Sequence, residues 1–305
     1  MPDLPFVKYH GLGNDYVYVD GFTHGVADPA KLARAVSPRH TGVGADGLIL
    51  VLPPTAEGRA AGAHCRMRMF NADGSEGQMC GNGIRCVAKF ARDHRLFPGV
   101  AEADPMRVQT GAGVLTLGVE LDAAGRVATV GVDMGAPVLE PAEVPVLTAE
   151  LEPGPRPHTW TIPATDATAA QEAVFVSMGN PHAVLFRDAP LGRAEELRIG
   201  AALEAHPAFP ERMNLHAVFV RGGGAGGAGG EVDVIHWERG SGATLACGTG
   251  AAAVCVAGVL TGRTRRRLTA HLPGGPLGLQ WSEQTGRVRM TGPAVEVFSG
   301  VWPGA

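Results

Sequence analysis

Two short stretches of the chain decide its fold. They are Cys80-Gly81-Asn82-Gly83 and Cys247-Gly248-Thr249-Gly250, and their cysteines lie 167 residues apart. A second pair recurs at almost the same offset, because Gly13-Asn14-Asp15 is echoed by Gly179-Asn180-Pro181, 166 residues later. Two unrelated motifs that recur in register indicate a duplicated unit. We therefore expect two similar domains with one of these cysteines in each.

Each Cys-Gly-x-Gly stretch leads into a predicted helix. The first is expected over about Ile84–His94, and the second over Ala251–Leu260. The second is apolar on every side, which is typical of a buried helix. Short β-branched runs such as Val114–Val119 and Val127–Val132 alternate with glycine-rich turns, as strands do. The predicted fold class is α/β (α+β), with two pseudo-symmetric domains, each a curled, mostly antiparallel sheet around a central buried helix.

The expected domain boundaries follow from this duplication. Residues 1–128 with 292–305 form the predicted N-terminal domain, which carries Cys80, and residues 129–291 form the C-terminal domain, which carries Cys247. Two connections are predicted to be long loops. Residues 140–157 are rich in Pro and Glu, and the Gly/Ala stretch at residues 221–230 is expected to be a flexible hairpin extension.

Composition and charge exclude several classes of protein. Apolar residues make up 45% and charged residues 18% of the 305 residues, as in ordinary globular proteins. The formal charge of −4 argues against nucleic acid as a partner. Neither an apolar run of roughly 18–20 residues nor a signal peptide is present, so we expect a cytoplasmic protein without a membrane partner. In that compartment the five cysteines should be reduced, and the lack of CxxC and HxxxH pairs predicts no metal site.

A cysteine followed by Gly-x-Gly at the start of a helix offers specific chemistry. Glycines let a ligand approach the backbone closely, and the first helical N–H groups can bind an anion such as an α-carboxylate. The same helix end is expected to lower the pKa of the cysteine below its usual value of about 8.5. Two such thiols, one in each domain, could act on opposite sides of one carbon as base and acid. That arrangement inverts a stereocentre.

Longer motifs around these residues closely resemble the diaminopimelate epimerase family. The resemblance covers nearly the whole chain and implies interconversion of LL- and meso-2,6-diaminopimelate, in lysine and peptidoglycan precursor biosynthesis. It also implies that no cofactor, pyridoxal phosphate included, takes part, and that the enzyme is a homodimer. The motifs are His10-Gly11-Leu12-Gly13-Asn14-Asp15, Asn71-Ala72-Asp73-Gly74-Ser75-Glu76, Met79-Cys80-Gly81-Asn82-Gly83, Met178-Gly179-Asn180-Pro181-His182, Glu238-Arg239-Gly240 and Ala246-Cys247-Gly248-Thr249-Gly250.

The resemblance also implies roles for individual residues. It makes Cys80 and Cys247 the two catalytic bases, with His182 and Glu238 tuning the thiols. The backbone positions expected to cradle the reacting α-carboxylate are Gly81, Asn82, Gly248 and Thr249. The side chains expected to hold the distal amino-acid end of the substrate are those of Asn14, Asn71, Asn180, Asn214, Glu238 and Arg239. Amide, guanidinium and carboxylate groups together supply the donors and acceptors that a zwitterionic end requires.

The chain departs from the family pattern at four places. Gly47 stands where many members have Gln, Gly77 replaces a more usual Val, and Ala243 replaces Glu in Gly-Glu-Thr. Residues 222–230 look like an insertion. The changes at Gly47 and Ala243 bear on contacts with the substrate, and none of the four alters the thiols.

Three alternatives remain open. A related proline or hydroxyproline racemase would usually carry His at the position of Asn82 and would lack the Glu238-Arg239 pair. A dithiol redox protein is disfavoured because the thiols lie 167 residues apart without a CxxC motif. A non-catalytic amino-acid binder would not need two thiols. Cys65, Cys86 and Cys255 are expected to be core residues, and Asp15 is expected to be structural, capping or turn-forming.

Overall fold

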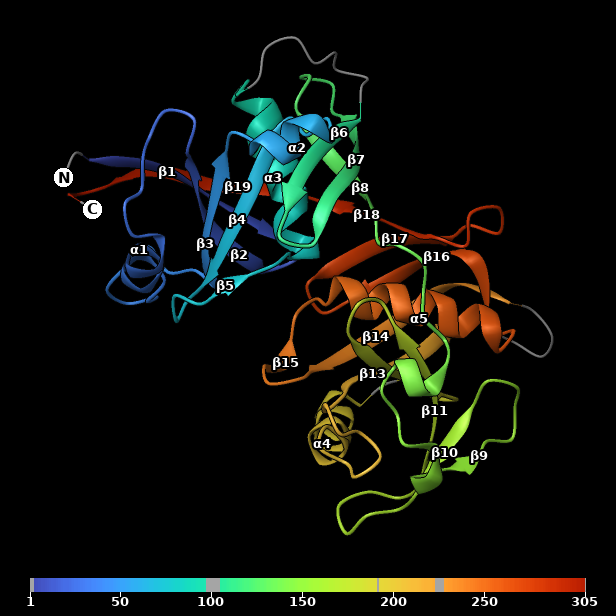
Figure 1. Cartoon of the computed structure of the whole chain (residues 1–305). Helices are drawn as coiled ribbons and strands as arrows, with labels where there is room; N and C mark the ends of the chain where they lie inside the picture. The colour runs from blue at the N-terminus through green and yellow to red at the C-terminus, as the bar shows by residue number, and fades with distance from the viewer. Residues whose placement is uncertain (1–2, 97–104, 191, 223–227, 305) are drawn as a thin grey trace. The chain divides into compact units, whose positions relative to one another are not determined.

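The computed structural model describes residues 3–96, 105–190, 192–222 and 228–304. The chain divides into two compact units, shown in Figure 1. Unit 1 comprises Met1–Val132 and Thr291–Ala305, and unit 2 comprises Asp133–Met290. The chain therefore passes between the units at the end of β8 (Val127–Asp133) and within β18 (Val288–Pro293).

Unit 1 is built mainly from strands, with one long helix. Its helices are α1 (Pro29–Val36), α2 (Ala56–Ala60) and α3 (Gly81–Asp93). Its strands, besides β8, are β1 (Leu4–Gly11), β2 (Asn14–Asp20), β3 (Gly47–Leu52), β4 (Cys65–Asn71), β5 (Glu76–Gly77), β6 (Met106–Thr110), β7 (Gly113–Leu121) and β19 (Val295–Trp302).

Unit 2 repeats this plan. Its helices are α4 (Arg193–Leu203) and α5 (Gly248–Leu260), with short 3-10 helices η1 (Pro141–Glu143) and η2 (Thr148–Glu150). Its strands, besides β18, are β9 (Glu152–Pro153), β10 (Trp160–Ile162), β11 (Gln171–Ser177), β12 (Pro181–Arg187), β13 (Asn214–Arg221), β14 (Gly229–Glu238), β15 (Gly242–Thr244), β16 (Thr264–Leu272) and β17 (Gly275–Trp281).

The strand pairings of the two units follow the same sequence of orientations. In unit 1, β1–β2, β3–β4 and β6–β7 are antiparallel, while β2–β3 and β4–β6 are parallel. In unit 2, β11–β12, β13–β14 and β16–β17 are antiparallel, while β12–β13 and β14–β16 are parallel. The register also matches, because Tyr16 lies opposite Gly47 and His182 lies opposite Asn214. The predicted fold class is confirmed, and the repeated pairings bear out the duplication.

Both central helices begin earlier than predicted. Helix α3 starts at Gly81 and α5 at Gly248, because Cys80 and Cys247 are their N-cap residues and each cysteine side chain accepts a first-turn N–H group. Glycine has a poor helix propensity, so the sequence hid this first turn. Helix α3 ends at Asp93, one residue before the predicted end, whereas α5 ends at Leu260 as predicted. Almost all of α5 is buried.

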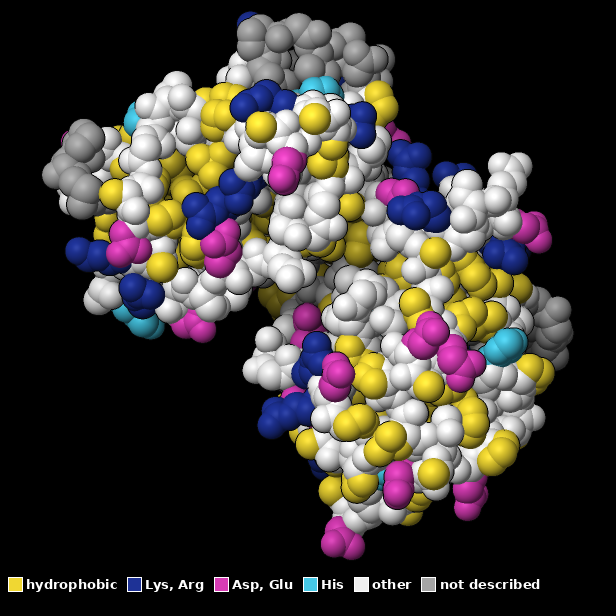
Figure 2. All heavy atoms as spheres, in the orientation of Figure 1, with side chains coloured by type: hydrophobic (Ala, Val, Ile, Leu, Met, Phe, Trp, Pro, Cys, Tyr) yellow, Lys and Arg dark blue, Asp and Glu magenta, His cyan; other side chains and the backbone are white. Residues whose placement is uncertain are grey.

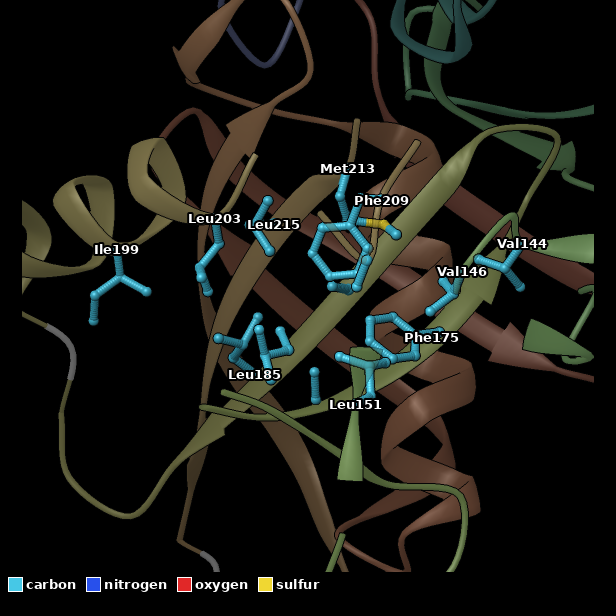
Figure 3. Close-up of a cluster of buried hydrophobic side chains, with 14 residues drawn as sticks. Val144, Val146, Leu151, Phe175, Leu185, Ile199, Leu203, Phe209, Met213 and Leu215 are labelled. Atoms are coloured by element: carbon cyan, nitrogen blue, oxygen red, sulfur yellow. The ribbon is translucent and has the colours of Figure 1, made fainter. Parts of the chain in front are cut away.

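Residues 140–157 are not the plain loop that was predicted. They contain η1, η2 and β9, and Val144, Val146 and Leu151 pack into the core of unit 2, whereas Leu147 is exposed. Figure 3 shows Val144, Val146 and Leu151 pointing into the same cluster as Phe175 and Phe209. Composition alone misread this segment because three of its few apolar residues become buried in the core.

The structure also bears on the predicted core cysteines and on the predicted hairpin extension. Cys65, Cys86 and Cys255 are buried, as predicted for core residues. Strands β13 and β14 pair as an antiparallel hairpin from Leu215 to Arg221, but residues 223–227 of the predicted flexible extension lie outside the described residues. Figure 2 shows basic and acidic side chains interspersed over both units in that view. In the described part of the chain, every helix is too short or too polar to cross a membrane.

Candidate active site

The first thiol lies at the start of α3. Cys80 is half-buried, and its Sγ accepts a hydrogen bond from the N–H of Gly83 at 3.3 Å. The thiol also donates to Oδ1 of Asn14, again at 3.3 Å. The hydroxyl of the buried Tyr16 hydrogen-bonds to both Asn14 and Cys80. Two predicted site residues of unit 1, the thiol and one asparagine, are therefore in direct contact.

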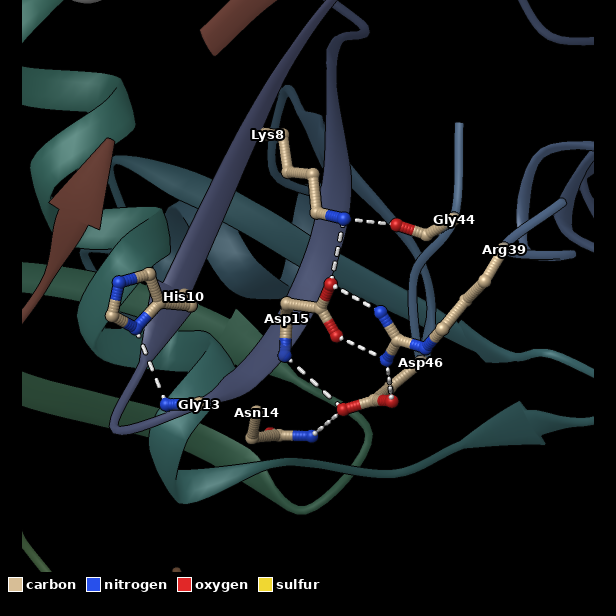
Figure 4. A network of polar contacts seen from close by, with 8 residues as sticks. All are labelled: Lys8, His10, Gly13, Asn14, Asp15, Arg39, Gly44 and Asp46. Atoms are coloured by element: carbon tan, nitrogen blue, oxygen red, sulfur yellow. Dashed lines mark hydrogen bonds and ion pairs between the residues drawn. The ribbon is translucent and has the colours of Figure 1, made fainter. Parts of the chain in front are cut away.

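A network of charged groups fixes the amide of Asn14. Its Nδ2 donates to Oδ2 of Asp46 at 2.8 Å, which turns its carbonyl oxygen toward Cys80. Arg39 bridges Asp46 and Asp15, and Figure 4 shows the guanidinium between the two carboxylates. Asn14 therefore presents an acceptor to the thiol because its donor is already occupied.

Asp15 is structural, as predicted, but it acts as a buried ion-pair centre and not as a cap or turn residue. Its carboxylate lies 2.7 Å from Nζ of Lys8 and 2.8 Å from Nη2 of Arg39. Burial alone would raise the pKa of Asp15, but hydrogen bonds and charges from Arg39 and Lys8 outweigh it and lower the pKa. The sequence hid this role because the two cations lie 7 residues before and 24 residues after Asp15.

Two other predicted site residues of unit 1, Asn71 and Asn82, each make a local side-chain hydrogen bond. Asn71 ends β4, and its Nδ2 donates to Oγ of Ser75 at 2.9 Å. Asn82 is buried in the first turn of α3, where its Oδ1 accepts from Arg85 at 3.0 Å. A Cβ at Gly47 would lie 2.0 Å from the carbonyl oxygen of Phe70, so the backbone there has no room for a side chain.

The second thiol occupies the corresponding place at the start of α5. Cys247 is 4% exposed, and its Sγ accepts from the N–H of Gly250 at 3.3 Å and lies 3.5 Å from Oγ1 of Thr249. It also hydrogen-bonds to the carboxylate of Glu238. Burial and the charge of Glu238 raise the pKa of Cys247 well above its usual value, although the N–H of Gly250 opposes the shift. The expectation of a lowered thiol pKa was therefore wrong for Cys247.

Glu238, at the end of β14, is the immediate partner of Cys247. It accepts a hydrogen bond from Oγ1 of Thr244, and burial raises its pKa. Ala243, which departs from the family pattern, lies on β15 opposite Trp237 and is exposed. Glu238 is thus held by Thr244 without a carboxylate at position 243.

His182 belongs to a chain of three buried imidazoles. Its Nε2 lies 2.9 Å from Oδ1 of Asn180, and its Nδ1 lies 2.8 Å from Nε2 of His216. His216 in turn reaches Nδ1 of His236 at 2.7 Å. All three rings are fully buried, and burial lowers the pKa of His182 and of His236 to about 3 and that of His216 well below its usual value.

Asn214 and Arg239 are joined to each other by a hydrogen bond. Asn214 is buried, its Nδ2 donates to the carbonyl of Pro181 at 2.7 Å, and its Oδ1 accepts from the backbone N–H of Arg239 at 2.9 Å. The guanidinium of Arg239 donates to the carbonyl of Glu211 at 2.8 Å. Asn214 is therefore already engaged with the backbone at two points.

The two helix N-termini leave backbone donors at the predicted carboxylate positions. The first i→i−4 bonds run from Ile84 N to Cys80 O and from Ala251 N to Cys247 O. The N–H groups of Gly81, Gly248 and Thr249 precede these bonds, as the N–H of a first helical turn does. Across the described residues, no three His, Cys, Asp or Glu side chains are arranged to hold a metal ion.

Comparison with known proteins relates this arrangement to one family. The family model described as "Diaminopimelate epimerase" matches residues 6–140 and 174–297, well over half of the chain. A diaminopimelate epimerase of Desulforudis audaxviator is 48% identical over 307 residues, covering 98% of this chain and 99% of that one. Another from Desulfovibrio desulfuricans is 46% identical over 297 residues and covers 97% of each chain.

Solved structures share the fold at low sequence identity. A hydroxyproline epimerase from Agrobacterium vitis matches with a TM-score of 0.64 at 14% identity, covering 99% of this chain and 91% of that chain. A phenazine biosynthesis protein of the PhzF family from Bacillus anthracis matches with a TM-score of 0.64 at 16% identity, covering 99% of both chains. At this identity the likeness concerns the fold.

Proposed function

This chain belongs to the diaminopimelate epimerase family, and we propose that it interconverts LL- and meso-2,6-diaminopimelate without a cofactor. As an isomerase of lysine and peptidoglycan precursor biosynthesis, it would invert one of the two α-carbons. One observation carries the proposal: in each unit a cysteine caps a central helix, and its Sγ accepts the N–H of the glycine three residues later at 3.3 Å. A duplicated thiol of this kind supplies the two bases that inversion requires.

The reaction balances as a proton exchange at carbon. One cysteine, as thiolate, removes the α-proton, and the other, as thiol, delivers a proton to the opposite side of the carbanion. No electrons are lost or gained, and the next turnover in the reverse direction restores the starting protonation. Cys80 and Cys247 are the proposed pair. Burial and Glu238 raise the pKa of Cys247, which favours its thiol form, so Cys247 is the proposed proton donor in one direction of the reaction.

Glu238 is the proposed partner of Cys247 in proton exchange. Its carboxylate hydrogen-bonds to the thiol, and its own pKa is raised by burial, which favours proton exchange between the two groups. His182 reaches the substrate site through Asn180, its hydrogen-bond partner. We therefore assign His182 a positioning role in support of the thiol chemistry.

The substrate carboxylate and its distal end require separate recognition. The N–H groups of Gly81, Asn82, Gly248 and Thr249 are the proposed cradle for the reacting α-carboxylate, where helix N-termini also stabilise developing negative charge. The proposed ligands of the distal zwitterion are the side chains of Asn14, Asn71, Asn180, Asn214, Glu238 and Arg239. Asn214 would act with its remaining amide hydrogen, since its oxygen is bonded to Arg239 N.

Three broader features complete the proposal. The two compact units correspond to two epimerase domains with one thiol each. The protein acts in the cytoplasm, in keeping with five free cysteines. It forms a homodimer, which is supported by exposed apolar side chains on β19: Val295, Val297, Phe298 and Val301 are 40–57% exposed.

Proton exchange tests the proposal directly. The protein is incubated with LL-diaminopimelate in D₂O under reducing conditions, without added cofactor, and α-deuteration and meso product are followed. We expect deuterium at the α-carbon that becomes inverted. Proline is the matched control substrate, because a proline racemase would exchange its α-proton instead. Absence of both exchange and meso product would refute the assignment.

A further inference from the structure

The three buried histidines of unit 2 form a directed chain that ends at a proposed substrate ligand. We propose that His216 and His236 are positioning residues, which lock the tautomer of His182 and thereby turn the amide NH₂ of Asn180 toward the substrate. This inference rests on the proposed function, because Asn180 is a proposed ligand of diaminopimelate. It adds two residues that neither the sequence motifs nor the family resemblance singled out.

The direction of the chain follows from hydrogen-bond chemistry. The carbonyl oxygen of Asn180 can only accept, so Nε2 of His182 carries the proton. A neutral imidazole then has an acceptor at Nδ1, which must receive the Nε2–H of His216. The Nδ1 of His216 is consequently an acceptor and receives the Nδ1–H of His236.

The far end of the chain decides between this direction and its reverse. Nε2 of His236 is buried and has no hydrogen-bond partner among the described residues. In the direction given above, this atom is a bare acceptor. In the reverse direction it would be an N–H donor buried without a partner, and orphaned buried N–H groups are rarer in proteins than under-satisfied acceptors. The reverse direction would also require the Asn180 amide to turn its NH₂ toward His182.

The sheet and α5 hold the chain rigidly. His216 and His236 lie directly opposite each other on β13 and β14, and His182 lies on β12, the other neighbour of β13. A Cβ at Gly250 would lie 2.3 Å from Cε1 of His216, so this ring is pressed against the first turn of α5. That same turn carries Cys247 as its cap. The imidazole chain is therefore built into the support of the thiol as well as of Asn180.

The consequence is a choice between donor and acceptor at position 180. With the tautomers fixed, Asn180 offers N–H groups, which suit a substrate carboxylate. Without His236, Nδ1 of His216 loses its donor, the tautomers of His216 and His182 become interchangeable, and the amide of Asn180 can turn over. The substrate would then meet a carbonyl oxygen for part of the time, and an unmatched acceptor is costly in a buried contact.

Nitrogen NMR on the wild-type protein tests the tautomers without reference to activity. With ¹⁵N-labelled histidine at pH 7, two-bond proton correlations should show His182 and His216 as Nε2–H tautomers and His236 as an Nδ1–H tautomer. An Nδ1–H tautomer at His182, or a charged ring in the chain, would overturn the inference. If these tautomers are found but diaminopimelate is not turned over, the proposed function fails while the orientation of Asn180 stands.

A matched pair of variants tests the consequence. His236→Leu removes the donor, whereas His236→Asn keeps an N–H at the position of Nδ1. We expect KM for diaminopimelate to rise about tenfold in His236→Leu, with kcat changed less than about threefold, since one hydrogen bond is at stake. His236→Asn should stay within about twofold of wild type. His271→Gln controls for loss of a histidine, because His271 on β16 is partly exposed and hydrogen-bonds to Glu231 at the surface.

Two outcomes would contradict the inference. Wild-type KM in His236→Leu would show that the chain does not act on Asn180. Equal damage in His236→Asn and His236→Leu would show that packing of the ring, and not its N–H group, matters. If His236→Leu does not fold, the tautomers and KM of His236→Asn still decide the question.

Discussion

The two units place the same backbone around each thiol but support it with different chemistry. By strand register, Tyr16, Ile49 and Met69 of unit 1 correspond to His182, His216 and His236 of unit 2. In both units the three side chains are buried. Unit 1 thus places an aromatic and two apolar side chains where unit 2 places three linked imidazoles. The duplicated fold fixes where the thiol stands, and the layer beneath it is free to vary.

The orientation of the two equivalent asparagines differs as a result. Asn14 gives its NH₂ to Asp46 and shows its carbonyl oxygen to Cys80. Asn180 gives its carbonyl oxygen to His182 and keeps its NH₂ for other partners. A ligand with both donor and acceptor groups is met by both kinds of amide. The comparison predicts that each unit should respond differently to equivalent substitutions.

The largest expected effect falls on the thiols, where the units are alike. Cys80→Ser and Cys247→Ser should each lower kcat by about 10²–10⁴-fold, the usual contribution of one general acid or base. Serine keeps the size of the side chain and can cap the helix, so circular dichroism should remain that of wild type. Formation of meso-diaminopimelate from the LL isomer gives the rate. Full activity in either variant would remove that cysteine from the proposed pair.

A smaller effect separates the units at the third residue after each thiol. A Cβ at Gly83 would meet the end of the Ile49 side chain at 2.8 Å, whereas one at Gly250 would meet ring atoms of His216 at 2.3–2.9 Å. An aliphatic tip can rotate away, but a hydrogen-bonded ring cannot.

Gly250→Ala is therefore expected to destabilise by about 2–3 kcal/mol, as overpacking of a core does. Gly83→Ala should cost less than about 1 kcal/mol, because the gain in helix propensity offsets the crowding. Urea midpoints of the two variants measure the difference. Equal midpoints would mean that the histidine chain yields as easily as an aliphatic side chain.

The next prediction concerns the stability of the fold at acid pH, and the sign of the change follows from the pKa of the buried histidine rings. An unfolded histidine titrates near pH 6.5, whereas His182 and His236 in the fold titrate near pH 3. Below pH 6.5 the unfolded chain binds protons that the folded chain does not, so stability falls as pH falls. Each such ring contributes about 1.4 kcal/mol per pH unit.

A variant that copies the unit 1 residues into unit 2 tests this sign. His216→Ile with His236→Met removes two of the three rings and should lessen the slope by up to about 2.7 kcal/mol per pH unit between pH 6 and pH 4. Urea unfolding at several pH values measures it. Asp15 is the internal comparison, because its lowered pKa makes unit 1 lose stability below about pH 4. An unchanged slope would show that the buried rings are charged.

These contrasts mark what could be predicted from the sequence. The duplication, the two helices and the thiols that precede them could be predicted because each depends on a short contiguous motif. The imidazole chain was not, because its members are 34 and 20 residues apart and meet only through strand register. Register depends on how strands pair, and the alternating patterns on β12, β13 and β14 do not state it.

Electrostatics was equally hard to predict. Helix N-termini lower a thiol pKa, and the sequence shows where such ends lie. The sequence does not show that Cys247 is 4% exposed and faces Glu238. Burial and the charge of Glu238 together outweigh the helix end and raise the pKa of Cys247. The role of Asp15 was missed for a similar reason, since its partners come from β1 and from the loop after α1.

The smallest expected effect compares the hydrogen-bond networks that hold Asn180 in unit 2 and Asn14 in unit 1. Unit 2 holds Asn180 through a linear chain, in which each ring has one donor to lose. Unit 1 holds Asn14 through a branched network, in which Asp15 has two cations and Asp46 bonds Asn14 directly. Arg39 is 56% exposed along its side chain, so its ion pairs contribute little in water.

Arg39→Gln should therefore cost less than about 1 kcal/mol and leave KM for diaminopimelate within about twofold of wild type. Lys8 still neutralises Asp15, and Asp46 still accepts from Asn14. Urea unfolding and steady-state kinetics, run beside His236→Leu, provide the comparison. A rise in KM as large as that expected for His236→Leu would show that the branched network is no more tolerant than the chain, and that Arg39 alone orients Asp46.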